Sequence, residues 1–226
     1  MRTDSFEDLK IRHLLGSVVK TSDFRAFVDV YVAPPLRPKH WCWDARRSLR
    51  VENAGGNSED SECVSIQYMV DRFAAKDVLL EMEVKYIFSY KMVDYIAVIQ
   101  NKRVGISVTR AMPFPLGGHY SDEQALALLQ KKLVGLIIAR EGVSEEQSFT
   151  TCILHILVPS VDVAYTVQRA HTRMLSEEDS RVDLDYEERI RDVIVLITVS
   201  KEIPSVFLST KALLSTSLVG LNKSLY

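Results

Sequence analysis

Two neighbouring runs in the middle of the chain, residues 93–99 and 103–110, are rich in residues that favour β-strands. A short polar connection separates the runs, and this pattern predicts a β-hairpin. We expect Asn101 and Lys102 to form the turn, with the residues on either side of them paired across it. The position of the turn then sets which residues face one another along the whole hairpin.

This register sorts the hairpin residues onto two faces, because side chains alternate along a strand. On one face Asp94 is expected opposite Thr109, and Ser107 lies close by near the open end of the hairpin. The other face is apolar throughout and is expected to lie on the core. Its members are Tyr95, Ala97, Ile99, Val104, Ile106 and Val108.

The rest of the chain continues the pattern of an α/β protein. Residues 61–73 and 121–140 have the apolar spacing of helices, and Ser121 with Gln124 has the pattern of a capping box. The order of elements predicts a mixed sheet that contains a three-strand antiparallel meander and is flanked by helices. The remaining predicted elements are strands over residues 80–88, 149–158 and 193–199, and a helix that begins at Ser160.

The first 60 residues differ from this pattern. Residues 27–32 alternate like a strand, and Trp41 and Trp43 are expected on one face of a second short strand. A polar stretch with two glycines, residues 53–62, predicts a loop after them. The predicted organisation is an N-terminal β extension packed on the core over residues 1–60, an α/β core over 61–200, and a C-terminal helix or tail over 201–226.

The hairpin resembles the motif of the PD-(D/E)xK nuclease-like family. Members of that family place an aspartate on one strand and an acid, a variable residue and a lysine on the next, followed by a helix. Here Asp94 matches the first acid, whereas Ser107 stands at the second acid and Thr109 at the lysine. The resemblance covers residues 62–158 and implies a restriction-endonuclease-like core.

The family's chemistry depends on the positions that differ here. Its two acids hold a divalent cation, and its lysine helps to position or activate the attacking water. Hard cations prefer carboxylate oxygens, and a bound cation lowers the pKa of its water. Asp94 alone offers too few carboxylate oxygens for tight binding. The resemblance therefore implies a degenerate metal site with no cofactor, in a non-catalytic module that binds protein or nucleic acid.

An alternative is an active enzyme with a relocated site. An acid, a valine and a lysine occur in sequence at Glu83 to Lys85. If residues 80–88 form a strand followed by a turn of even length, Glu83 and Lys85 point to the same face as Asp94. These three catalytic candidates would then hold Mg²⁺ or Mn²⁺ in a metal-dependent phosphodiesterase or nuclease. The same alternation is also typical of an ordinary half-exposed strand, so both interpretations stay open.

A third interpretation rests on a basic and aromatic cluster. Trp41 and Trp43 lie close to Arg46 and Arg47, and such a cluster can stack bases and hold phosphates. It can equally bind a partner protein or pack the N-terminal extension onto the core. Arg110, at the end of the hairpin, is a further candidate contact. With the acidic residues 176–188, this surface would suit an intracellular scaffold subunit.

The amino-acid composition excludes few of these functional interpretations. The 226 residues are 47% hydrophobic and 26% charged, which is typical of a globular protein with one substantial core. The formal net charge of −2 provides no general attraction to nucleic acid. Three dispersed cysteines argue against a zinc site or a disulfide framework. His155, in a fully apolar run, is expected to be a hydrogen-bonded core residue.

No segment of the sequence predicts targeting to a membrane. The N-terminus is acidic and lacks the apolar stretch of a signal peptide. The longest apolar runs are too short to cross a bilayer. We therefore expect an intracellular location, cytoplasmic or nuclear, and no membrane partner.

Overall fold

The structure of this protein is a computed structural model. It describes residues 26–32, 40–51, 59–88, 90–113, 118–176, 190, 193–201 and 206–207. Most of the predicted C-terminal helix or tail, and the acidic residues 177–189, lie outside the described residues. The strands are β1 (Phe27–Val32), β2 (Lys76–Leu80), β3 (Tyr95–Ile99), β4 (Lys102–Arg110), β5 (Thr151–Val158) and β6 (Val193–Lys201).

All six strands belong to one mixed sheet with the order β1-β6-β5-β4-β3-β2. Strands β1, β6, β5 and β4 run parallel to one another. Strands β3 and β2 complete an antiparallel meander with β4. The expected α/β class, the mixed sheet and the meander are confirmed. The strand predicted at residues 27–32 is β1, which lies at one edge of the same sheet beside β6.

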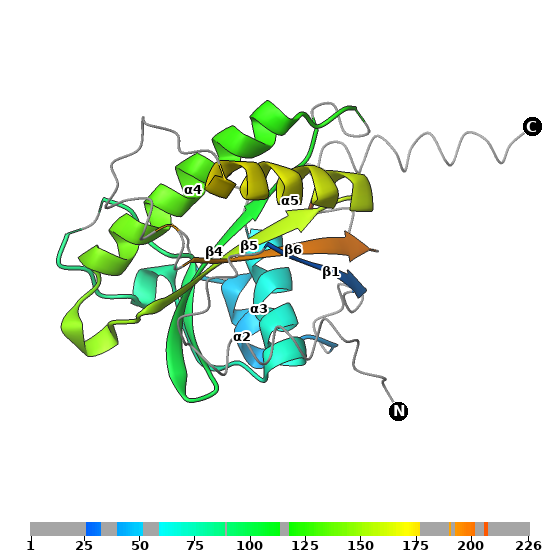
Figure 1. The fold of residues 1–226 in the computed structure, drawn as a ribbon. Coiled ribbons are helices and arrows are strands. Elements are labelled where there is room, and N and C mark those ends of the chain that lie inside the picture. The colour runs from blue at the N-terminus through cyan, green and yellow to red at the C-terminus, as the bar shows by residue number, and fades with distance from the viewer. Residues whose placement is uncertain are drawn as a thin grey trace, which may run out of the picture.

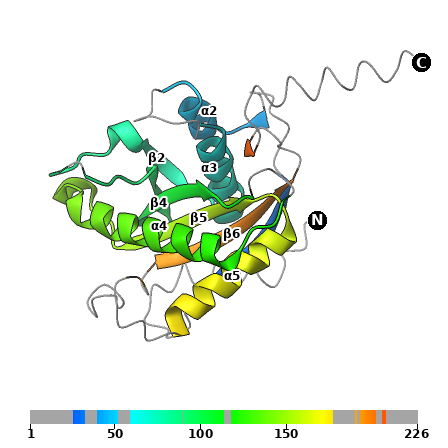
Figure 2. The same cartoon turned by 90° about the horizontal axis from the view of Figure 1, so that it is seen from above.

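Helices cover both faces of this sheet. They are α2 (Trp43–Ser48), α3 (Glu59–Phe73), α4 (Asp122–Gly142) and α5 (Val161–Ser176). Helices α2 and α3 lie on one face and α4 and α5 on the other (Figure 1, Figure 2). The predicted capping box of α4 is present, because Ser121 Oγ accepts from Gln124 N at 3.3 Å and Gln124 Oε1 accepts from Ser121 N at 3.0 Å.

Each face of the sheet has its own hydrophobic core. The predicted apolar face of the hairpin packs with α2 and α3. The opposite face, which includes Ile96, packs under α4 and α5 and is also buried. All eight residues of β5 are buried, as expected for a central strand covered on both sides. Among the described residues, no helix is long and apolar enough to cross a membrane.

The hairpin turn lies one residue earlier than expected. Ile99 pairs with Lys102, so Gln100 and Asn101 form the turn, with φ angles of 50° and 62°. Positive φ at both central residues is the two-residue turn whose twist matches that of the strands. The pairing therefore shifts by two residues, which keeps every side chain on its predicted face.

Two other predicted elements are wrong. The strand predicted over residues 80–88 lies earlier in the chain. It is β2, which ends at Leu80, and a 3-10 turn, η2 (Glu81–Glu83), follows at once. The Glu83 carboxylate accepts a hydrogen bond from Leu80 N at 2.9 Å and closes this turn locally. Beyond it the chain leaves the sheet, and Ile87 N donates to Gly142 O at 2.7 Å at the end of α4.

The short strand expected around Trp41 and Trp43 is instead the beginning of α2. Cys42 is the N-cap residue, and its Sγ accepts from Ala45 N at 3.4 Å. Trp41 packs in the core below α3, whereas Trp43 is 64% exposed. The two tryptophans therefore do not share a face, because Trp41 precedes the helix and is buried, whereas Trp43 begins it and is exposed.

Gly105 fills a position that accepts no larger residue. A Cβ atom there would lie 2.3 Å from the ring of Phe149. We expect Gly105→Ala to lower the free energy of unfolding by about 1–3 kcal/mol, the usual cost of forcing an atom into a packed core. Urea denaturation measures this cost.

Gly135 in α4 provides the matched control. Its nearest neighbour, Lys91 Cδ, is 4.0 Å from the position of a Cβ. Gly135→Ala should therefore raise stability by about 1 kcal/mol through helix propensity. Equal unfolding midpoints for the two variants would contradict the assignment of Gly105 to a tight contact.

Candidate functional site

Asp94 immediately precedes β3 and is bonded to the strand beside it. Its backbone N donates to Ile106 O at 3.0 Å. Its carboxylate Oδ2 accepts from Ser107 Oγ at 2.9 Å and from Val108 N at 2.7 Å. The shifted register thus brings Asp94 and Ser107 together, while Thr109 lies two residues further along β4 and not opposite Asp94 as expected.

Burial and charge act on the Asp94 carboxyl in opposite directions. Removal from water raises its pKa above the ordinary value. The positive charge of Lys132, the N–H of Val108 and the hydroxyl of Ser107 lower the pKa in part. Lys132 is half-buried on α4. It flanks the buried stripe of the helix at Leu133.

Glu83 and Lys85 are bound to other partners. Glu83 accepts hydrogen bonds from Arg47 and from Leu80 N. Lys85 Nζ lies 3.2 Å from Glu146 Oε2 on the surface. Among the described residues, no hydrogen bond or ion pair joins either of them to Asp94.

A metal site would need several carboxylate, histidine or cysteine side chains close together. Within the described ranges, no three of them lie close enough together to hold a metal ion. Asp94 is the carboxylate in the hairpin, and an N–H and an O–H point at its oxygen. These donors have the polarity opposite to that of the ligands a hard cation needs.

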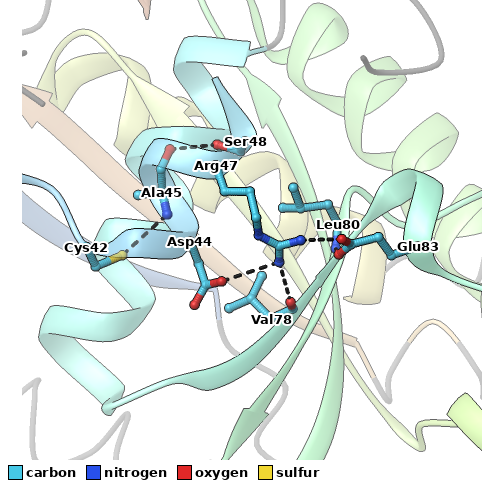
Figure 3. Close-up of polar contacts among 8 residues, drawn as sticks. All are labelled: Cys42, Asp44, Ala45, Arg47, Ser48, Val78, Leu80 and Glu83. Carbon is cyan, nitrogen blue, oxygen red and sulfur yellow. Dashed lines mark hydrogen bonds and ion pairs between the residues drawn. The ribbon is translucent and has the colours of Figure 1, made fainter. Parts of the chain in front are cut away.

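Arg47 fastens α2 to the edge of the sheet. Its Nη2 donates to Val78 O at 2.7 Å on β2 and lies 3.3 Å from Asp44 Oδ1 (Figure 3). Its Nη1 binds Glu83 on η2 (Figure 3). Arg47 was expected to contact nucleic acid or a partner. In the structure its charge is balanced by two carboxylates of the same chain.

The other candidate contacts separate into buried and exposed residues. Arg110 Nη1 donates to Val206 O at 2.8 Å and holds residues 206–207 against the core. Trp41 is 5% exposed. Trp43 is open to solvent, and the Arg46 guanidinium lies 5.8 Å from the centroid of its ring. Trp43 and Arg46 are therefore the members of the predicted set that remain available.

A buried polar network, which the sequence did not reveal, links α3 to three strands. Ser65 Oγ lies 2.7 Å from Tyr95 Oη and 2.7 Å from His155 Nδ1. His155 Nε2 lies 2.9 Å from Thr198 Oγ1. The prediction of a hydrogen-bonded core histidine is confirmed, and burial lowers the pKa of His155 to about 3.

Comparisons with known proteins add little to this site. No protein-family model matches the chain, and no solved structure matches it. The chain is 35% identical over 107 residues to the AAC-rich mRNA clone AAC4 protein of Dictyostelium discoideum. That match covers 45% of this chain and 16% of the Dictyostelium protein, whose name states no activity.

The buried histidine makes the stability of the protein depend on pH. In the unfolded chain His155 binds a proton below about pH 6.5, whereas the buried ring stays neutral. Stability should therefore fall as the pH drops from about 6.5 toward 3. Through His155 alone, a change from about pH 7 to about pH 5 should cost about 2 kcal/mol.

Urea denaturation at both pH values tests this dependence. His155→Gln should be less stable at neutral pH and should lose less stability on acidification than the wild type. His119→Gln, at an exposed position, should keep the wild-type dependence. A His155→Gln variant with the wild-type pH slope would refute the proposed origin of the effect.

Proposed function

We propose that this chain is a non-catalytic interaction module on a restriction-endonuclease-like core with a degenerate metal site. The order α3-β2-β3-β4-α4-β5 supports such a core, since a helix precedes an antiparallel meander and a helical crossover leads to a parallel strand. The fold alone does not imply an activity. The hairpin is therefore the part of the fold from which a function can be inferred.

The state of the Asp94 carboxylate carries the proposal. In an acid-x-lysine site, the strand that carries Ser107 would supply a second carboxylate beside the first. Here that strand donates two hydrogen bonds to Asp94. A carboxylate held in this way stabilises the hairpin, because hydrogen bonds to a charged group are among the stronger ones. Both donors bind Oδ2, and a cation at Asp94 would find the Ser107 hydroxyl in place of a second acid.

The engagement of the nearby acid-x-lysine residues supports the same proposal. Glu83 binds Arg47 and closes η2, and Lys85 pairs with Glu146. A relocated catalytic site would need both side chains to leave these partners and approach Asp94. The exposed Lys85–Glu146 pair costs little to separate. Glu83 is held by two groups, the Arg47 guanidinium and Leu80 N, and would have to leave both.

Restoring the second acid gives a direct test. We expect the wild type and Asp94→Ala to show no difference in calorimetric titrations with Mn²⁺. Ser107→Asp should bind Mn²⁺, because two carboxylates would then face one another across β3 and β4. Its two like charges should lower the melting temperature, and Mn²⁺ should raise it again.

Two controls make the outcome specific. Asp94→Ala combined with Ser107→Asp should abolish the gained binding, and Thr150→Glu, an added acid on an exposed residue, should gain none. Mn²⁺ binding by the wild type that Asp94→Ala removes, together with cleavage of a plasmid, would establish the active enzyme instead. A Ser107→Asp variant that folds and binds no metal would refute the restriction-endonuclease-like geometry.

A further inference from the structure

Helix α2 presents an exposed aromatic and apolar surface that the hairpin does not use. We define the α2 surface as Trp43, Arg46, Leu49, Arg50 and Met82. Trp43 is 64% exposed, Met82 60% and Leu49 38%. Met82 belongs to η2, which Arg47 ties to α2 through Glu83. Tryptophan, methionine and arginine are enriched where proteins contact one another.

The charges on this surface are not balanced within the described part of the chain. Arg47 is paired with Asp44 and Glu83. Arg46 and Arg50 form no ion pair among the described residues. Arg46 Nε is buried without a hydrogen-bond partner among the described residues, and the guanidinium lies 5.8 Å from the centroid of the Trp43 ring. Within the same part of the chain its two terminal nitrogens form no hydrogen bond, so they can meet an external acceptor.

An arginine that lies over an exposed tryptophan ring is suited to one type of ligand. The planar guanidinium binds a carboxylate through two parallel hydrogen bonds. Trp43 beside it provides an apolar face for a neighbouring side chain. The combination is complementary to a segment in which an acidic residue lies beside an apolar one.

Single-stranded nucleic acid fits this surface less well. Such ligands need several cations along a groove that follows the phosphates. Arg47 is neutralised inside the chain, so Arg46 and Arg50 are the cations of the α2 surface that form no ion pair within the described ranges, and the formal net charge of the protein is −2. Leu49 and Met82 add apolar area that phosphates do not use.

The α2 surface is also held rigidly. Cys42 Sγ caps the helix, and Cys42 N donates to Gln67 Oε1 of α3 at 2.6 Å. Ser48 Oγ donates to Ala45 O at 3.0 Å inside the helix (Figure 3). Arg47 adds the bond to the Val78 carbonyl on β2. A binding surface that is already ordered loses less entropy when its partner arrives.

We propose that the α2 surface binds an acidic segment of a partner protein, with a carboxylate on Arg46 and an apolar side chain against Trp43. This inference rests on the proposed function and names the partner class of the interaction module. The segment is recognised by its chemistry, an Asp or Glu next to an apolar residue.

Selection from a phage-displayed library of random dodecapeptides tests the inference. The full chain is the bait. The enriched peptides should carry Asp or Glu beside an apolar residue. In fluorescence anisotropy, a synthetic copy should bind at least about tenfold more weakly to Trp43→Ala and to Arg46→Gln. The copy with its acids changed to amides should lose binding to the same degree.

Matched variants on the opposite face of the sheet give the control. Tyr165→Ala removes a 55% exposed aromatic ring from α5, and Lys131→Gln removes an exposed charge from α4. Both should leave the affinity unchanged. Thermal melting of Trp43→Ala should match the wild type, because that ring is largely in water.

Several outcomes would overturn the inference. They are the absence of enrichment, enriched peptides without carboxylates, and binding that is indifferent to Trp43→Ala. Binding of oligothymidylate that depends on Trp43, without peptide binding, would assign the surface to nucleic acid. Manganese binding that depends on Asp94 would overturn the proposed function alone, since the peptide assay does not involve the hairpin.

Discussion

The register of the β3–β4 hairpin is the constraint on which the rest of the structure depends. Its two turn residues, Gln100 and Asn101, have positive φ and fix which residue of β4 faces each residue of β3. That register places Gly105 under the Phe149 ring and Ser107 beside Asp94. A slip by one residue would exchange the two hydrophobic cores, because the sheet is buried on both faces. The pairing of β4 with β5 then carries the same register into the parallel half of the sheet.

Polar groups on the two faces of the sheet have a structural role before any functional one. On the α4 face the Asp94 carboxylate accepts from β4, and on the α3 face His155 joins Ser65 to Thr198. Buried groups of this kind cost free energy unless they are bonded. Once bonded, they define one position for each neighbouring element, since an apolar contact alone would permit sliding. Asp94, which suggests a metal site in the sequence, therefore has a structural role in the fold.

Much of the fold follows from the sequence because its signals are local. The Ser121 capping box begins α4 where expected, and the apolar run of β5 is buried throughout. The errors arise where a contact distant in sequence decides the structure. Glu83 continues an alternating pattern, yet it closes a turn and binds Arg47 on another helix. In the site, the meeting of Asp94 with Ser107 depends on a shift of two residues in pairing, and the approach of Lys132 depends on how α4 lies on the sheet.

The two surfaces of interest are connected through Glu83. As a catalytic acid it would have to turn toward Asp94, on the face that α4 covers. As a structural residue it binds Arg47, which in turn holds α2 against the Val78 carbonyl. This pair neutralises Arg47 and leaves Arg46 as the cation that lies over the exposed Trp43 ring. The same carboxylate cannot serve both arrangements. The contacts that hold Glu83 are those that build the α2 surface, so the proposed absence of catalysis and the proposed binding surface would have one structural cause.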